Sequence, residues 1–316
     1  MRVSSTVPPR YRQHTLVAYL AARFTYWDAA RWQALIAAGQ VWLNGAPAHA
    51  GSPVAPGDVV ACELPDLTPT QAIAVDVLYA DETLLAVNKP GGVRVHAHGR
   101  FVVDSLIHYL RHRHAPPYPD ATLVHRLDAG TSGVLLLARG AAAAAALGAQ
   151  FSSQTVEKAY LAVVHGIPAH DAGTIDLPLG PAPGSRLRYR QAVVRGDEGK
   201  TAVTHYRLVR RLGAQHALLA LQPRTGRTHQ LRVHLAAIGY PIVGDALYTM
   251  DDDAFLAWTA ARTPTPAMHD MRRQALHCWQ IRCRHPVGER PFTFTAPLPP
   301  DITALVERLQ SNSCDS

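Results

Sequence analysis

One acidic residue of this chain lies in a run of polar and glycine residues between two apolar stretches. The segment Leu123-Val-His-Arg-Leu-Asp-Ala-Gly-Thr-Ser-Gly-Val-Leu-Leu-Leu-Ala138 carries Arg126 and Asp128 near its centre. Glycines beside a polar cluster let the backbone approach a ligand, and the apolar run after Gly133 predicts a strand that would hold a carboxylate rigidly. Asp128 is therefore a candidate catalytic acid. An ordinary salt bridge between Arg126 and Asp128 at a turn is the alternative.

A second polar segment, Pro223-Arg-Thr-Gly-Arg-Thr-His-Gln-Leu-Arg-Val-His234, concentrates basic side chains. Two arginines and two histidines fall within eight residues: Arg227, His229, Arg232 and His234. We expect a helix over residues 228–237 that ends at Gly239, with Arg227 just before it and free to reach into a cleft. The histidines are five residues apart, whereas two metal ligands on a helix need a spacing of four, so no metal site is predicted.

Two shorter segments supply further candidates. A strand is predicted over residues 159–164. If the strand alternation extends to the residues just before it, Lys158 and Tyr160 lie on one face of a sheet. The turn Asn88-Lys-Pro-Gly-Gly92 brings Lys89 to a sheet edge. A half-exposed surface is the alternative for Lys158 and Tyr160.

The chain divides into a small and a large part. Residues 1–13 are expected to form a polar arm, and residues 14–64 a compact module with two short helices, a hairpin at Asn44-Gly45 and a last strand over 59–63. A linker rich in proline and threonine at 65–72 then leads into a domain over 73–308, and 309–316 form a tail.

Strand signals dominate the large part, and helices at 141–149 and 228–237 interrupt them without regular alternation. This pattern predicts an α+β fold with a mixed, largely antiparallel sheet. The polar stretch 250–271 is expected to be a surface insertion.

Composition narrows the class of protein. The chain has 316 residues with 31 Lys and Arg against 24 Asp and Glu, and this excess favours a polyanionic partner. The four cysteines match neither a zinc site nor a disulfide framework. No segment reaches the roughly 18 apolar residues that a membrane span needs. We expect a cytoplasmic protein without membrane attachment.

In their order along the chain, these segments resemble the RluA-type family of pseudouridine synthases that act on large-subunit ribosomal RNA. The motifs are Asn-Lys-Pro-Gly-Gly, His-Arg-Leu-Asp followed by Thr-Ser-Gly, Lys-Ala-Tyr, and Gly-Arg-Thr-His-Gln-Leu-Arg-Val-His followed by Gly-Tyr-Pro-Ile-Val-Gly-Asp, and they cover about residues 78–248. The ending Ala296-Pro297-Leu298-Pro299 also matches. The module at 14–64 is similar to the alpha-L RNA-binding motif.

The resemblance implies a reaction and roles for residues. A uridine in RNA would be isomerised to pseudouridine without any cofactor, with Asp128 as the essential acid, either as a nucleophile on ribose C1′ or in an elimination through a glycal. Arg227 would keep Asp128 ionised, and Tyr160 would stack on the uracil. The remaining active-site support would come from Arg126, Lys158 and Leu231. The basic residues expected to contact RNA are Arg23, Arg31, Lys89 and Arg232.

Ribosomal RNA is the expected partner, with transfer RNA as a second substrate class, and a monomer is expected. A catalytically idle RNA-binding or ribosome-assembly factor on the same fold is the main alternative from another class. A metal-dependent hydrolase is disfavoured because the histidine spacing does not suit it.

Overall fold

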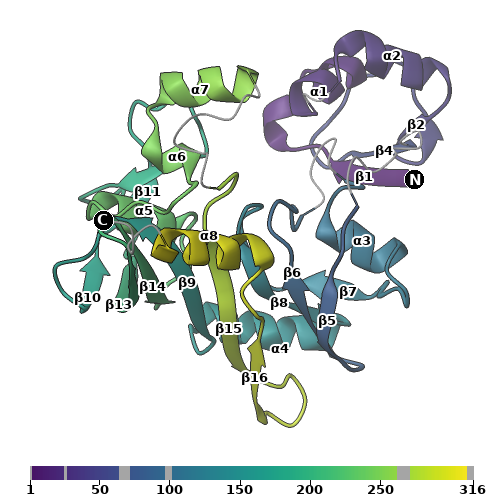
Figure 1. Cartoon of the computed structure of the whole chain (residues 1–316). Helices are drawn as coiled ribbons and strands as arrows, with labels where there is room; N and C mark the ends of the chain where they lie inside the picture. The colour runs from purple at the N-terminus through teal and green to yellow at the C-terminus, as the bar shows by residue number, and fades with distance from the viewer. Residues whose placement is uncertain (1, 25–26, 64–71, 97–101, 262–270, 312–316) are drawn as a thin grey trace. The chain divides into compact units, whose positions relative to one another are not determined.

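The computed structural model describes residues 2–24, 27–63, 72–96, 102–261 and 271–311. The chain forms two compact units (Figure 1). The small unit comprises Met1–Ala72 and Ala97–Ser105, and the large unit comprises Ile73–His96 and Leu106–Ser316. Most of the linker expected at 65–72 lies outside the described residues.

The small unit is a four-stranded antiparallel sheet with two helices. Its sheet has the order β1-β4-β2-β3. The elements are β1 Arg2–Thr6, the 3-10 helix Pro9–Tyr11, α1 Leu16–Arg23, α2 Ala29–Ala37, β2 Val41–Leu43, β3 Ala46–Pro47 and β4 Val59–Glu63. Asp28 caps α2, because its carboxylate accepts the N–H of Arg31 at 2.8 Å. The predicted turn is also present, with Asn44 and Gly45 at positive φ.

Two boundaries of the small unit differ from the sequence-based expectation. Residues 2–6 are not a separate arm, since β1 pairs with β4 and Val7 is buried in the core of the unit. The chain also returns to this unit after its first strands in the large unit, where Val102 packs against the same core. Both segments contribute apolar side chains that a module of residues 14–64 would leave uncovered.

The large unit is built on a ten-stranded mixed sheet. Its main path has the order β10-β13-β14-β9-β15-β8-β6-β5, with β16 beside β15 and β7 beside β8. The strands are β5 Asp76–Ala80, β6 Leu84–Lys89, β7 Ala121–Leu123, β8 Ser132–Arg139, β9 Glu157–His165, β10 Ala172–Asp176, β13 Val203–Leu212, β14 His216–Pro223, β15 Leu276–Arg284 and β16 Pro291–Thr295. The pairing of β15 with β8 is parallel, and the other pairings are antiparallel. The predicted α+β class with a largely antiparallel sheet is thus confirmed.

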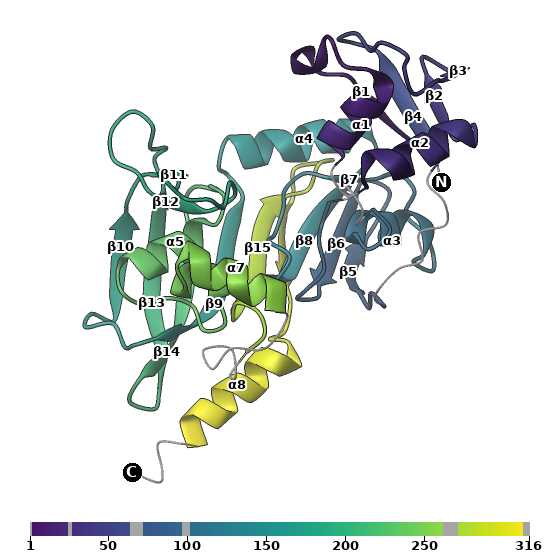
Figure 2. The same cartoon turned by 90° about the horizontal axis from the view of Figure 1, so that it is seen from above.

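Helices cover both sides of this sheet, with α4 behind it and the yellow α8 in front (Figures 1 and 2). The helices are α3 Leu106–His112, α4 Ala141–Ser152, α5 Gln230–Ala237, α6 Ala246–Thr249, α7 Asp252–Ala261 and α8 Pro300–Ser311, and a separate hairpin joins β11 Leu179–Pro181 to β12 Gln191–Val193. Strand β8 is almost fully buried because it lies between the helices and the neighbouring strands. In the described part of the chain, no helix is long and apolar enough to cross a membrane.

The stretch 250–271 is not simply a polar surface insertion. Part of it forms α7, whose Phe255 is buried in a small apolar cluster with Leu187, Ala246 and Leu247. The three aspartates at 251–253 make the start of this stretch polar, and Leu187, which belongs to the same cluster, is distant in sequence. Residues 262–270 lie outside the described residues.

Glycine at position 133 allows β8 to begin directly beside β15. Gly133 has a φ of +111°, and an added Cβ would collide with the main-chain carbonyl of Cys278 on β15. Only glycine fits this close approach of two backbones. The polar segment that carries Asp128 therefore leads into a strand whose start is held tightly against the centre of the sheet.

Asp81 joins the β5–β6 turn to the end of β15. Its carboxylate accepts hydrogen bonds from the main-chain N–H groups of Thr83 and Leu84, the Tyr79 hydroxyl and His285 Nε2, at 2.7–2.8 Å. Burial alone would raise the pKa of Asp81, but these donors hold the pKa well below its ordinary value.

We predict that Asp81→Asn lowers the free energy of unfolding at pH 7 by about 1–3 kcal/mol. Because folding lowers this pKa, the contribution is complete above the unfolded value of about 3.9 and is lost as the pH falls below it. Urea denaturation of wild type and variant at pH 7 and at pH 3 measures the difference in the free energy of unfolding, which should be smaller at pH 3. Asp76→Asn is the control, since Asp76 accepts only a long 3.4 Å bond from Asn88 at the surface. A loss as large for this control would contradict the assignment.

Candidate active site

A pocket of about 410 Å³ opens in the large unit beside the polar segment that follows β7. Its walls come from residues 125–131, from β9, from the loop after β14 and from the first turn of α5. Seven of the ten residues singled out from the sequence line it: Arg126, Asp128, Lys158, Tyr160, Arg227, Leu231 and Arg232. The predicted strand alternation of Lys158 and Tyr160 is consistent with their presence in one wall.

Arg232 is the cation that pairs with Asp128. Its Nη1 donates to Asp128 Oδ2 at 2.9 Å, while Nε and Nη2 donate to the two carboxylate oxygens of Asp245 at 2.6 and 2.7 Å. The side chain of Asp245 is only 1% exposed and that of Arg232 only 9%. Burial alone would lower the pKa of Arg232, but the two carboxylates raise it well above its ordinary value.

The expectation that Arg227 pairs with Asp128 is therefore wrong. Arg227 is exposed, and its Nε donates to the main-chain carbonyl of Thr201 at 3.0 Å. Equally, Arg232 is not a surface contact for RNA, because its guanidinium is buried between two carboxylates. In the described part of the chain, Asp128 ion-pairs with Arg232 and not with Arg126, so a salt bridge at the turn is not found either.

Arg232, and not Arg227, reaches Asp128 because of the residue at which α5 begins. The helix starts at Gln230 instead of Thr228, since His229 adopts a left-handed conformation with φ 56° and ψ 17°. Gln230 holds this loop in shape: its Oε1 accepts from Thr225 and from the N–H of Arg227, and its Nε2 donates to Val203 on β13. Arg232 is then within the first turn of the helix.

His125 fixes the start of the segment that carries Asp128. Its Nε2 accepts the N–H of Leu136 on β8 at 2.9 Å, and its ring stacks on Phe151 at 4.5 Å. Burial lowers the pKa of His125 to about 3, and the nearby Lys158 lowers it further, so the ring is neutral at pH 7. A neutral ring can accept this main-chain hydrogen bond, whereas a protonated one cannot.

Lys89 holds the residue after Asp128 from the other side. The ammonium is fully buried and donates to the carbonyls of Pro90, Val93 and Ala129 at 2.8, 2.8 and 3.0 Å. Burial lowers the pKa of Lys89 to about 7, Arg273 lowers it further, and Asp128 opposes both effects. The expectation that Lys89 contacts RNA is wrong, because its side chain points inward from the sheet edge.

Tyr160 and Leu231 make the less polar part of the pocket. Tyr160 is 8% exposed and Leu231 is 6% exposed. Burial, together with the neighbouring Cys278, raises the pKa of Tyr160 well above its ordinary value, so the phenol stays protonated at neutral pH. Burial also lowers the pKa of Lys158. Arg126 is exposed at the pocket.

The remaining two candidates lie in the small unit. Arg31 is exposed on α2, with its guanidinium 5.8 Å from the ring centre of Trp27. Arg23 ends α1 and is half-buried beside Phe24, at 5.5 Å. Neither residue belongs to the pocket.

Sequence reasoning gave no role to three residues at the site: His229, Asp245 and Tyr248. His229 was considered only as a metal ligand, and Asp245 was noted only within the Gly-Asp pair of a motif. Among the described residues, no group of three or more His, Cys, Asp or Glu side chains is arranged to hold a metal ion.

The chain was compared with known proteins. The family model described as "RNA pseudouridylate synthase" matches residues 83–237. A protein of Xylella fastidiosa named "Ribosomal large subunit pseudouridine synthase D" is 37% identical over 98% of this chain and 93% of its own length. An uncharacterized RNA pseudouridine synthase of Bacillus subtilis is 32% identical over 98% of this chain and 99% of its own. The solved structure of human RNA pseudouridylate synthase domain containing 1 has a TM-score of 0.59 at 25% identity and covers 79% of this chain and 98% of that one.

We predict that the two arginines differ sharply in their effect on stability. Arg232→Met should lower the free energy of unfolding by about 3–5 kcal/mol, because it leaves Asp245 buried without its cation. Arg227→Met is the matched control and should cost less than about 1 kcal/mol, since an exposed side chain is removed. Urea denaturation of both variants measures this, and equal losses would be inconsistent with the buried pairing.

Proposed function

The chain belongs to the RNA pseudouridylate synthase family, and we propose that it converts specific uridines of large-subunit ribosomal RNA to pseudouridine with Asp128 as the catalytic carboxylate. The enzyme is an isomerase that acts on RNA. In the reaction the bond from ribose C1′ to N1 of uracil breaks, C1′ bonds to C5, the hydrogen of C5 leaves as a proton, and N1 takes up a proton. The observation that carries the proposal is the ion pair of Asp128 with Arg232 at a pocket wall.

Arg232 pairs with Asp128 and orients its carboxylate. A carboxylate beside an apolar base would lose its charge on burial unless a cation compensates, and Arg232 is that cation. Because Arg232 donates to Oδ2, Oδ1 is left as the oxygen for the substrate. It would bond to C1′ in a nucleophilic route, or remove a ribose proton in an elimination through a glycal.

Tyr160 and Leu231 are suited to hold the detached uracil while it rotates. A phenol ring offers a stacking face to a base, and Leu231 supplies an apolar contact within the same pocket. Since Tyr160 remains protonated at neutral pH, its hydroxyl can donate a hydrogen bond to the base. Lys158 lies in the same wall of the pocket.

A base that enters this pocket must leave the RNA stack, which costs a few kcal/mol. Arg126 is exposed at the pocket two residues before Asp128. Its guanidinium can occupy the space that the base vacates or bind a phosphate. The small unit, with Arg31 on the surface of α2, would add sequence-independent contacts to the RNA backbone.

Ribosomal RNA is favoured over transfer RNA by the relatives. The Xylella fastidiosa protein carries a ribosomal large-subunit name and matches this chain over nearly its whole length, small unit included. A catalytically idle RNA-binding factor is disfavoured, because Asp128 retains its buried cation and Tyr160 its place in the pocket. Such a factor would need neither.

We predict that Asp128→Asn abolishes pseudouridine formation while the fold is kept. The substitution removes the negative charge and the reactive oxygen, but leaves an acceptor for Arg232. Tritium release from RNA labelled at C5 of uridine measures the activity, on large-subunit ribosomal RNA and on transfer RNA in parallel. A wild-type rate for the variant would refute the mechanism, and release from transfer RNA alone would overturn the proposed substrate.

We also predict that Arg31→Gln weakens binding without slowing the reaction of saturated enzyme. Each lost phosphate contact should flatten the dependence of log affinity on log salt by about 0.7–0.9. Filter binding at several salt concentrations, together with kcat at saturating RNA, tests this. Gln33→Ala, an exposed neutral change on the same helix, is the control. A reduced kcat with unchanged affinity would contradict a binding role for the small unit.

A further inference from the structure

His229 lies between the Asp128–Arg232 pair and α6. Its Nδ1 is 2.7 Å from the Tyr248 hydroxyl, and its Nε2 is 3.8 Å from Asp128 Oδ2. The two rings meet nearly at a right angle, with centres 5.7 Å apart. The side chain of His229 is 12% exposed. No role for this histidine follows from the ion pair or from the pocket wall described above.

Hydrogen bonding at Tyr248 determines which nitrogen of His229 carries the proton. The Tyr248 hydroxyl accepts the main-chain N–H of Gln191 at 3.2 Å. The hydroxyl keeps one proton to donate, and if it donates this proton across the short contact with His229, Nδ1 is the acceptor and Nε2 carries the hydrogen. This N–H faces the same carboxylate oxygen that Arg232 binds.

The surroundings keep both rings neutral at pH 7. Burial lowers the pKa of His229, Asp128 and Asp245 oppose this change, and Arg232 and Arg126 add to it. Burial raises the pKa of Tyr248 to about 12. These groups lie in the segment before β8, in α5, at the N-cap of α6 and in α6 itself.

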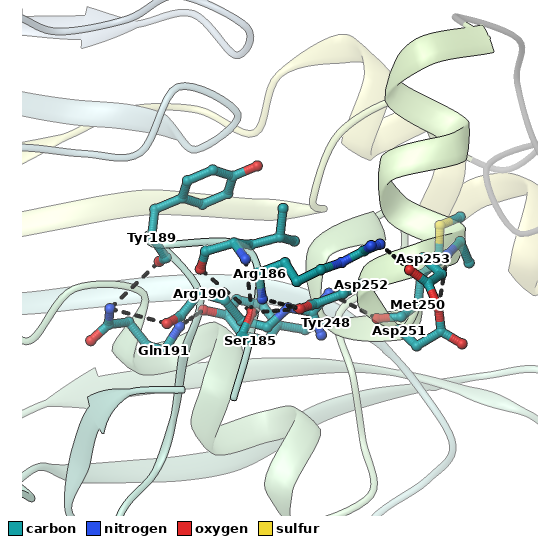
Figure 3. A network of polar contacts seen from close by, with 12 residues as sticks. Ser185, Arg186, Tyr189, Arg190, Gln191, Tyr248, Met250, Asp251, Asp252 and Asp253 are labelled. Carbon is teal, nitrogen blue, oxygen red and sulfur yellow. Dashed lines mark hydrogen bonds and ion pairs between the residues drawn. The ribbon is translucent and has the colours of Figure 1, made fainter. Parts of the chain in front are cut away.

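The partner of Tyr248 is itself held in place. Gln191 begins β12, directly after the loop 182–190, and Asp252 at the start of α7 fastens this loop (Figure 3). Asp252 accepts from the Ser185 hydroxyl and from the N–H of Arg186, both at 2.7 Å, and ion-pairs with Arg190 at 3.0 Å. The Gln191 N–H is therefore a fixed donor to the Tyr248 hydroxyl.

We propose that His229 is a positioning residue for the catalytic carboxylate: Tyr248 holds its Nε2–H towards Oδ2 of Asp128, so that His229 and Arg232 together fix that oxygen and turn Oδ1 to the ribose. This inference rests on the proposed function. The 3.8 Å separation is longer than a hydrogen bond, and a small movement of Asp128 on substrate binding would close it. His229 would then stabilise the carboxylate in its reactive orientation without touching the substrate.

A purely structural role for His229 makes the opposite prediction for two substitutions. Position 229 has left-handed backbone geometry, which asparagine tolerates better than other residues with a side chain. If only the backbone matters, His229→Asn is the milder change. Glutamine can instead place an amide N–H near the position of Nε2, so His229→Gln is the milder change if that donor matters.

The experiment compares kcat and KM for tritium release by His229→Asn, His229→Gln and Tyr248→Phe. We expect Asn and Phe to lower kcat about tenfold, roughly 1.4 kcal/mol of transition-state stabilisation, with KM changed less than about twofold. His229→Gln should retain most of the wild-type kcat. Tyr240→Phe, at a half-buried tyrosine outside the pocket, is the control and should leave kcat unchanged.

Double substitution tests whether Tyr248 acts through His229. If it does, His229→Asn combined with Tyr248→Phe falls no further than His229→Asn alone. A further tenfold drop, or an Asn variant more active than the Gln variant, would overturn the proposal. Tyr248→Phe leaves the left-handed backbone at position 229 untouched, so its effect on kcat tests the proposal even if the variants at position 229 fail to fold.

The tautomer gives a readout that needs no activity. Long-range nitrogen–proton NMR of wild-type protein with labelled histidine should show His229 protonated at Nε2, and Tyr248→Phe should allow the Nδ1 form to appear. Protonation at Nδ1 in the wild type would overturn the inference. Failure of the wild type to release tritium from any RNA would instead count against the proposed function, which keeps the two outcomes apart.

Discussion

Arg232 binds two carboxylates with one guanidinium, and the arrangement of the site depends on this. Asp245 is buried almost completely and takes two of the donors, while Asp128, at the pocket, takes a third. A buried ion pair is costly to form and more costly to break, so Arg232 cannot leave Asp245. The position of Asp245 thereby determines where the guanidinium of Arg232 lies, and the guanidinium orients the carboxylate of Asp128.

The backbone around Asp128 is held as firmly as its side chain. His125 accepts a hydrogen bond from β8, Lys89 donates to the carbonyl of Ala129, and Gly133 lets β8 start against β15. The first two groups are polar and buried, yet each is satisfied by main-chain partners, which is how buried polar groups are accommodated. A segment without regular secondary structure is thus fastened to the sheet at several points, which limits how far a carboxylate on it can move.

The same principle connects the hairpin loop to the site. Asp252 fastens the loop, Gln191 at its end donates to Tyr248, and the Tyr248 hydroxyl lies 2.7 Å from His229 Nδ1. The first two steps use donors whose direction the backbone determines. The surface of this loop carries Arg186 and Arg188, both exposed, so contacts made there by RNA would act on the element that orients His229.

The sequence by itself determined what depends on near neighbours. The Asn44-Gly45 turn, the cap at Asp28, the alanine-rich helix α4 and the start of the strand after Gly133 all follow from preferences within a few residues. The α+β class and the two polar segments that line the pocket could be predicted for the same reason. The order of the motifs indicated the family. The boundaries of the small unit could not, because β1 and Val102 join it through contacts with distant strands.

Only the tertiary structure decided which cation serves Asp128. Arg227 and Arg232 are five residues apart, and the sequence offers both. The choice depends on the left-handed turn at His229, because it makes α5 begin late, and on Asp245, because its carboxylate holds Arg232. Arg232 then pairs with Asp128, which lies 104 residues away in sequence. The inward direction of Lys89 depends in part on a distant segment as well, since Ala129, one of its three acceptors, lies 40 residues away. Local spacing sets the period of a helix or strand, but the partner of a buried charge depends on which distant segments the fold brings together.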